Sequence, residues 1–191
     1  MVQNDLQPAL QLVVALRFYA CGKFQQVIGD TVNLHKSTIC CVISKVTDSI
    51  LQRKNNFISW PTEEELFENA AMVFNRSRIP NVCGLIDGTH IQIQRPHAHE
   101  ESFINRKSMH SINVQITGLS CHRITDVCAR WPGSSHDSWI LRNSGLCENF
   151  ETMTYPGIPN GILLADSGYS CNSWLITPVL DRPATTVSHF T

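Results

Sequence analysis

The chain has 191 residues, of which 42% are hydrophobic and 16% are charged, and its formal net charge is −1. The apolar content is sufficient for a buried core, and the near-neutral charge excludes a protein that binds nucleic acid through overall positive charge alone. No uncharged apolar run reaches the length of a membrane span, and the polar N-terminus lacks the pattern of a secretory signal peptide.

Helical periodicity marks three segments in the first sixty residues. Apolar residues recur at helical spacing in the first segment (Leu6, Leu10, Val13, Leu16 and Ala20), across residues 24–32, and from Ile39 to Ile50. Two short helices, a polar break and a longer third helix form a helix-turn-helix, which presents its third helix to DNA. We therefore predict that Lys45, on the polar face of the segment 36–52, contacts nucleic acid. The same periodicity also fits a helical bundle that only packs, and the two alternatives stay open.

Charge supports a division of the chain into parts. Residues 1–60 contain six Lys and Arg against three Asp, whereas the remaining residues contain nine basic and thirteen acidic side chains. A mildly basic front and an acidic back suit a nucleic-acid-binding segment joined to a cation site. A helix from the region of Pro61 to about Arg76 begins with three glutamates, which its N-terminal dipole favours. We predict a helix-turn-helix-like segment over 1–60, a helical connector over 61–80 and a second domain over 81–191.

Two apolar runs in the second domain each lead directly into an aspartate. Residues 82–86 precede Asp87, and residues 162–165 precede Asp166. Short apolar runs bounded by Gly and turn residues are typical of buried strands, and a carboxylate at the end of such a strand lies where a central sheet opens to a cleft. Two strands that each end in an aspartate can bring the two carboxylates together, and like charges at such close range need a cation between them. A metal site containing Asp87 and Asp166 is therefore predicted. Alternatively, Asp87-Gly88 is a hairpin turn between strands over 82–86 and 90–94.

The remaining elements complete a mixed sheet. Alternating residues over 112–117 and 124–129 predict a hairpin, and a loop over 131–137 opens a helix that runs to about residue 144. Asp137, at the start of that helix, is a third candidate metal ligand, or it only caps the helix together with Ser134. A helical turn over 172–174 and a strand over 175–178 follow. The expected fold class is α/β, with helices in front of a mixed sheet.

Five stretches together resemble the Harbinger/PIF transposases and the domesticated nucleases derived from them. They are, in chain order, residues 81–91, residues 105–107 with 111–115, residues 131–138, residues 164–169 and residues 174–178. The resemblance covers nearly the whole chain, including the helix-turn-helix segment. It implies an RNase H-like fold and a divalent-metal-dependent endonuclease that cleaves DNA phosphodiester bonds.

The resemblance also assigns roles to single residues. Asp87 matches the first catalytic acid, Asp166 matches the acid after the fourth strand, and Asp137 matches a further metal-binding position. The implied cofactors are two Mg²⁺ or Mn²⁺ ions. Arg106 and Lys107, near the strand edges, would hold the DNA backbone, although a solvated loop pair is equally consistent with their pattern. The family's last acid is a Glu in a downstream helix beyond the end of this sequence, so a domain truncated at its carboxyl end is expected.

The resemblance further implies a partner and a location. Family members work with a separate Myb/SANT-like DNA-binding protein, and we expect this chain in the nucleus and in the cytoplasm. Cys41 stands in the third helix where relatives often have a basic residue. That residue and the incomplete set of acids motivate an alternative, a catalytically inactive DNA-binding or adaptor protein. A non-functional fragment is a third possibility.

Overall fold

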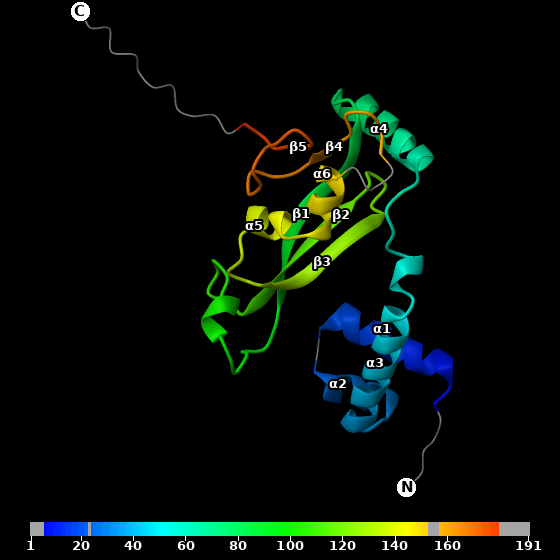
Figure 1. The fold of residues 1–191 in the computed structure, drawn as a ribbon. Coiled ribbons are helices and arrows are strands. Elements are labelled where there is room, and N and C mark those ends of the chain that lie inside the picture. Colours follow the sequence, from blue (N-terminus) through cyan, green and yellow to red (C-terminus); the bar gives the residue numbers. More distant parts are fainter. Residues whose placement is uncertain (1–5, 23, 153–156, 180–191) are drawn as a thin grey trace, which may run out of the picture. The chain divides into compact units, whose positions relative to one another are not determined.

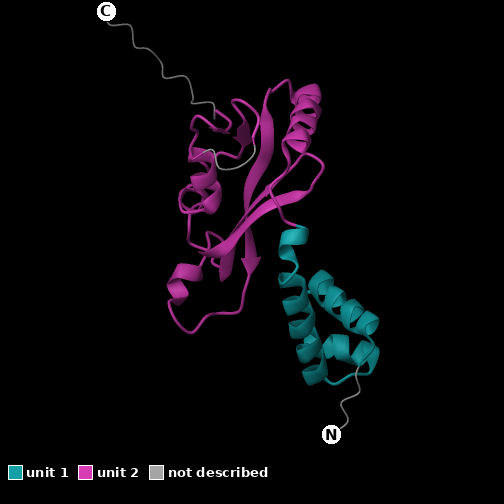
Figure 2. Ribbon diagram, turned by 45° about the vertical axis from the view of Figure 1, so that its right-hand side comes forward, with its two compact units in different colours: residues 1–57 teal, residues 58–191 magenta. Residues whose placement is uncertain are grey.

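The computed structural model describes residues 6–22, 24–152 and 157–179. It divides into two compact units, residues 1–57 and residues 58–191 (Figure 2). Residues 180–191, the last part of the predicted nuclease domain, lie outside the described residues. Within the described part, every helix is too short or too polar to cross a membrane.

The first unit contains α1 (Pro8–Cys21), α2 (Gln25–Val32) and α3 (Lys36–Leu51), followed by the short 3₁₀ helix η1 (Lys54–Asn56) (Figure 1). Asn33 adopts a left-handed conformation that ends α2, which explains the polar break before α3. The helices share a small core of buried residues, Val14, Ile28, Ile39, Val42 and Ile43. The three helical segments expected from periodicity are therefore present.

The face that α1 buries differs from the stripe expected from its sequence. Val14 and Ala15 are buried, whereas Val13 and Leu16 are 59% and 51% exposed. Because α1 has apolar residues on most of its circumference, periodicity cannot select the side that packs. The contacts of α1 with α3 make that selection.

The second unit is built around a mixed sheet, whose described strands have the order β3-β2-β1-β4-β5. The strands are β1 (Val82–Gln92), β2 (Ser111–Gly118), β3 (Ile124–Pro132), β4 (Ile162–Leu164) and β5 (Leu175–Ile176) (Figure 1). β1, β2 and β3 pair antiparallel, whereas β4 pairs parallel with both β1 and β5. The expected α/β class, with helices followed by a mixed sheet, is confirmed.

β1 runs straight through Asp87 and Gly88, so the hairpin alternative is wrong. Asp87 also lies within a strand, not at its end as expected. The reason is the pairing with β2, which places Asp87 opposite Ile116 and Gly88 opposite Gln115 within an unbroken ladder. Ladder pairing along eight residues of β1 outweighs the local turn preference of an Asp-Gly pair.

The helices of the second unit are α4 (Glu63–Ser77), α5 (Asp137–Arg142) and α6 (Gly145–Glu151), together with the 3₁₀ helix η2 (Glu100–Phe103). The helix expected from the 131–137 loop to about residue 144 is α5, which ends at Arg142. A further helix that the sequence did not predict, α6, follows where the Ser144 hydroxyl accepts a hydrogen bond from the Cys147 N–H at 3.3 Å. The helical turn expected over 172–174 is wrong: residues 173 and 174 form a bend, and the Asn172 side chain accepts a hydrogen bond from the Trp174 N–H at 2.9 Å.

One core joins these helices to the sheet. Leu66 of α4, Leu141 of α5 and Leu146 of α6 pack with Ile86 of β1 and Leu163 of β4, and all five are at most 4% exposed. The core fixes α5 against β1, which carries Asp87, and against β4, which Asp166 follows by two residues.

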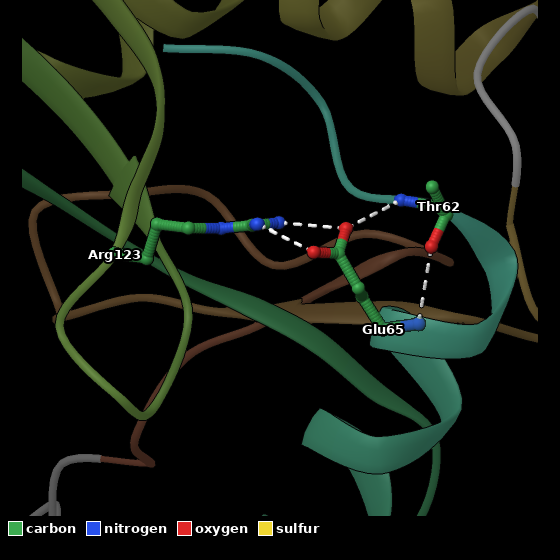
Figure 3. Close-up of polar contacts among 3 residues, drawn as sticks. All are labelled: Thr62, Glu65 and Arg123. Atoms are coloured by element: carbon green, nitrogen blue, oxygen red, sulfur yellow. Dashed lines mark hydrogen bonds and ion pairs between the residues drawn. The ribbon is translucent and has the colours of Figure 1, made fainter. Parts of the chain in front are cut away.

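Polar contacts fasten the start of α4 to the turn between β2 and β3 (Figure 3). The Glu65 carboxylate accepts hydrogen bonds of 2.5 and 2.8 Å from the Arg123 guanidinium. Thr62 and Glu65 form a capping box, in which each side chain bonds the other's backbone N–H, at 2.8 and 3.4 Å. These contacts, the Arg123 hydrogen bond first, hold the pKa of Glu65 at about 2, below its usual 4.5.

We expect Glu65→Gln to lower the melting temperature at pH 7. Folding depresses the pKa of Glu65, so the stabilisation from its carboxylate is fully present above about pH 4.5 and is lost as the pH falls toward 2. The melting-temperature difference between the variant and wild type should therefore shrink in acid. Thermal melts followed by circular dichroism measure it, with the exposed Glu64→Gln as control. A difference that stays constant from pH 7 to pH 3 would contradict the assignment.

Candidate active site

Asp87 and Asp166 occupy matching positions on neighbouring parallel strands. The register pairs Leu85 with Leu164, and each aspartate follows its leucine by two residues. Pairing between β1 and β4 ends at these leucines, whereas β1 stays paired with β2 as far as Gln92. The two aspartates therefore lie where β1 and β4 separate, past the carboxyl end of β4, where open α/β sheets bind ligands.

Asp137 reaches the same region from α5. Its Oδ1 accepts a hydrogen bond of 2.7 Å from the side-chain amide of Asn113 on β2. The capping position of α5 is held by His136, which makes no side-chain capping bond, so the predicted capping pair of Ser134 and Asp137 is wrong. The Asp137 carboxylate bonds to the sheet and not to its own helix, because α5 packs directly over β2.

Two glycines leave the space that the Asp137 carboxylate occupies. A Cβ at Gly88 would collide with Asp137 Oδ1 and would lie 2.9 Å from its Cγ. A Cβ at Gly168 would lie 3.0 Å from Asp137 Oδ2 and 3.1 Å from Asp166 Oδ1. Oxygens of two carboxylates thus converge on one point beside Gly168, and such an approach of like charges favours a bound cation.

Each of the three carboxylates is oriented by one hydrogen bond to its Oδ1. Backbone N–H groups of the following glycines donate to Asp87 at 2.8 Å and to Asp166 at 3.0 Å, and the Asn113 side chain donates to Asp137 at 2.7 Å. Within the described structure no hydrogen bond reaches the corresponding Oδ2 atoms. The site therefore presents oriented carboxylate oxygens, the ligand type preferred by Mg²⁺ and Mn²⁺.

Asp87 and Asp137 approach from different sides of β1. Side chains alternate along a strand, so Asp87 leaves β1 on the face opposite the one where Asp137 meets Gly88. Among residues 6–22, 24–152 and 157–179, no three His, Cys, Asp or Glu side chains are placed to hold one metal ion together. Mg²⁺ commonly keeps several waters and uses one or two carboxylates, so the Asp137 and Asp166 pair fits such an ion by its donor chemistry.

Tyr169 lies within electrostatic reach of all three carboxylates. Its side chain is 4% exposed, and its buried hydroxyl has no hydrogen-bond partner among the described residues. Burial raises the pKa of Tyr169 well above its usual value of 10, and the negative charges of Asp137, Asp87 and Asp166 raise it further, in that order. All three negative charges act on this one hydroxyl, and its raised pKa keeps the phenol protonated at neutral pH.

Asn113 is a site residue that sequence patterning does not single out. It belongs to a row of alternate polar residues on β2, all buried: Ser111, Asn113, Gln115 and Thr117. Alternating strands commonly expose their polar row, but this row is covered, and the Asn113 amide also donates to the Ser135 carbonyl at 3.0 Å. The lack of any charged side chain in the row is the one sequence signal that it faces the interior.

The predicted nucleic-acid contacts lie in different parts of the chain. Arg106 lies in the loop before β2, where its Nη2 is 3.5 Å from the Nδ1 of His136, the neighbour of Asp137. Lys107 is exposed in the same loop, and Lys45 is exposed on α3 in the first unit. Of these three residues, Arg106 is the one that contacts a neighbour of Asp137 in the sequence, and a DNA contact by any of them stays a prediction.

Comparison with known proteins identifies a matching family and several similar proteins. A family model described as DDE superfamily endonuclease matches residues 86–189. The chain is 32% identical over 176 residues to the Rattus norvegicus protein named "Putative nuclease HARBI1", covering 91% of this chain and 49% of that protein. The Homo sapiens protein of that name is 30% identical over 175 residues, with 91% and 49% covered.

A plant protein is similar to the same extent. The Arabidopsis thaliana protein named "Protein ALP1-like" is 30% identical over 192 residues, covering 94% of this chain and 47% of that protein. The chain thus spans about half the length of the curated relatives it matches. No solved structure gives a significant match.

Proposed function

The chain belongs to the DDE superfamily endonuclease family, and from that membership we propose that it is a divalent-metal-dependent endonuclease that cleaves phosphodiester bonds in DNA. The observation that carries the proposal is the convergence of Asp137 and Asp166 oxygens beside Gly168, with Asp87 at the matching level of β1. The similarity to proteins named as nucleases supports the same reaction class.

Asp166 and Asp137 would hold Mg²⁺ or Mn²⁺, with Asp87 contributing from the neighbouring strand. A bound ion of this kind polarises the phosphodiester and makes a coordinated water more acidic. The residues of this chain keep the ligands in place. Asn113 fixes Asp137, and the Ser138 hydroxyl donates to the Gly168 carbonyl at 2.7 Å, which ties α5 to the loop that carries Asp166.

Arg106 would hold the DNA backbone next to the site. Its Nη2 lies 3.5 Å from His136 Nδ1, which places the guanidinium next to the residue that precedes Asp137. Lys107 and Lys45 would add sequence-independent phosphate contacts, which weaken as the salt concentration rises. The Myb/SANT-like partner and the nuclear location remain predictions from family resemblance.

Nicking of supercoiled plasmid DNA tests the proposal. We would assay the 191-residue chain and a version extended to the length of its relatives, with Mn²⁺ and with EDTA. The expected result is conversion of supercoiled DNA to open circles in Mn²⁺ and none in EDTA.

The same preparations distinguish the competing hypothesis of an inactive DNA-binding or adaptor protein. An active site that binds Mn²⁺ raises the melting temperature with Mn²⁺ concentration, because the ion binds the folded state alone. DNA binding with neither nicking nor a Mn²⁺-dependent rise in melting temperature, in both versions of the protein, would reject the endonuclease.

A further inference from the structure

A hollow of about 560 Å³ lies beside the carboxylates, a size typical of small-molecule sites, which span about 300–1,000 Å³. It is lined by Ser134, Ser135, His136, Ser138, Trp139, Arg142 and Gly168. The Gly168 N–H donates to Asp166 Oδ1 at 3.0 Å, and a Cβ at Gly168 would lie 3.0 Å from Asp137 Oδ2. The hollow therefore adjoins the candidate active site, although none of the predicted metal ligands lines it.

Trp139 gives the hollow an aromatic wall. Its side chain is 42% exposed, although removing a large apolar ring from water lowers the free energy. Trp131 packs against it edge to face, with ring centroids 4.3 Å apart, and the Arg130 guanidinium lies 4.9 Å from the Trp131 ring centroid. These neighbours restrict the Trp139 ring while part of it stays exposed, so the ring would lose little further entropy when a partner stacks on it.

Hydrogen-bond donors and positive charge supply the rest of the lining. Arg142 is exposed and donates its Nε–H to the Ser138 carbonyl at 3.2 Å, which fixes the guanidinium near the hollow. His136 also lines the hollow, and the Arg106 Nη2 lies 3.5 Å from its Nδ1. Guanidinium, imidazole and hydroxyl groups recognise phosphate, whereas the carboxylates beyond Gly168 repel it, so a phosphate would lie on the Arg142 and His136 side.

We propose that this hollow binds an unpaired nucleotide of the DNA next to the bond that is cut. Its base would stack on Trp139, and its phosphate would contact Arg142 and His136. Bases inside a duplex are already stacked on both sides and cannot reach an indole, so the hollow selects single-stranded or locally opened DNA. The inference rests on the proposed function and adds the form of DNA that the site accepts.

Binding without cleavage tests the subsite. Fluorescence anisotropy in EDTA would compare a labelled single strand with a strand of equal length made of abasic nucleotides. Stacking contributes about 1–3 kcal/mol per base, so wild type should bind the normal strand about 10-fold more tightly than the abasic strand. Trp139→Leu should remove this difference, and Trp139→Phe, which keeps an aromatic ring, should retain most of it. Phe67→Leu is the matched control, since Phe67 is a 51% exposed aromatic residue on α4.

Arg142→Gln should weaken the binding of both strands to the same extent, because both contain the phosphate. The control Arg76→Gln, at an exposed arginine of α4, should leave the binding of both strands unchanged. The subsite is overturned if wild type binds the two strands equally well, or if Trp139→Leu weakens both strands equally. Base-dependent binding with neither nicking nor a Mn²⁺-dependent rise in melting temperature would reject the endonuclease and leave the subsite standing.

Discussion

Asp166→Ala is expected to reduce Mn²⁺-dependent plasmid nicking about 10³-fold or more. A metal ion contributes several kcal/mol of charge stabilisation to phosphodiester cleavage, and each 1.4 kcal/mol is about tenfold in rate. Asp166 Oδ1 and the Asp137 carboxylate converge beside Gly168, so removal of the Asp166 side chain leaves a single carboxylate there. Asp87→Ala should have a loss of similar size, because Asp87 lies at the same level of the neighbouring strand.

Two further variants separate charge from shape. Asp166→Asn keeps the volume and can still accept the 3.0 Å hydrogen bond from the Gly168 N–H, so a loss of nicking in this variant reflects the missing charge. Asp48→Ala removes an exposed carboxylate of α3 in the first unit and should leave nicking unchanged. Initial rates of open-circle formation measure all four variants. Unchanged rates in both Asp87→Ala and Asp166→Ala would end the assignment of this site.

Gly88→Ala is expected to damage the site without altering any charge. The backbone at Gly88 has ordinary strand geometry, so alanine is excluded only by the space that Asp137 and Asn113 occupy. The new methyl would displace the Asp137 carboxylate from its hydrogen bond to Asn113. Overpacking of this kind costs about 1–3 kcal/mol in the free energy of unfolding. Misplacing the groups that orient metal ligands lowers activity or affinity about 10- to 100-fold.

Gly145→Ala is the matched control for this substitution. A Cβ at Gly145, in the first turn of α6, would meet nothing within 4 Å. It should leave the free energy of unfolding and Mn²⁺ affinity close to wild type. Urea denaturation and Mn²⁺ titration followed by melting temperature provide the two measurements. A Gly88→Ala protein with wild-type stability and wild-type Mn²⁺ affinity would show that Asp137 is not confined by β1.

The position of Asp87 shows how far local sequence rules extend. The apolar run before it correctly predicts a strand, but Asp-Gly is also a turn signal, and local preference alone cannot decide between the two. Partner strand β2 decides, because its eight-residue ladder continues past Asp87 to Gln92. The aspartate thus owes its place near Asp166 to the end of the β1–β4 pairing and not to the end of its own strand.

Local sequence also does not decide which side of a helix or strand is buried. The apolar residues of α1 predict a helix but not its buried side, which contact with α3 selects. The alternation of β2 predicts a strand, yet its polar row is buried, and Asn113 in that row bonds to Ser135 and to Asp137 at the start of α5. Periodicity describes one element, whereas burial depends on which second element packs against it.

The amino-acid sequence by itself determines most of the helices and strands, the three aspartates and the family to which the chain belongs, because each depends on neighbouring residues or on ordered motifs. Tertiary structure alone decides the shape of the site. Asn113 meets Asp137 across 24 residues, Ser138 meets Gly168 across 30, and Gly88 makes room for a carboxylate from another element. These contacts join segments that are distant in the chain, so they arise only when the core brings α5, β1 and the end of β4 together.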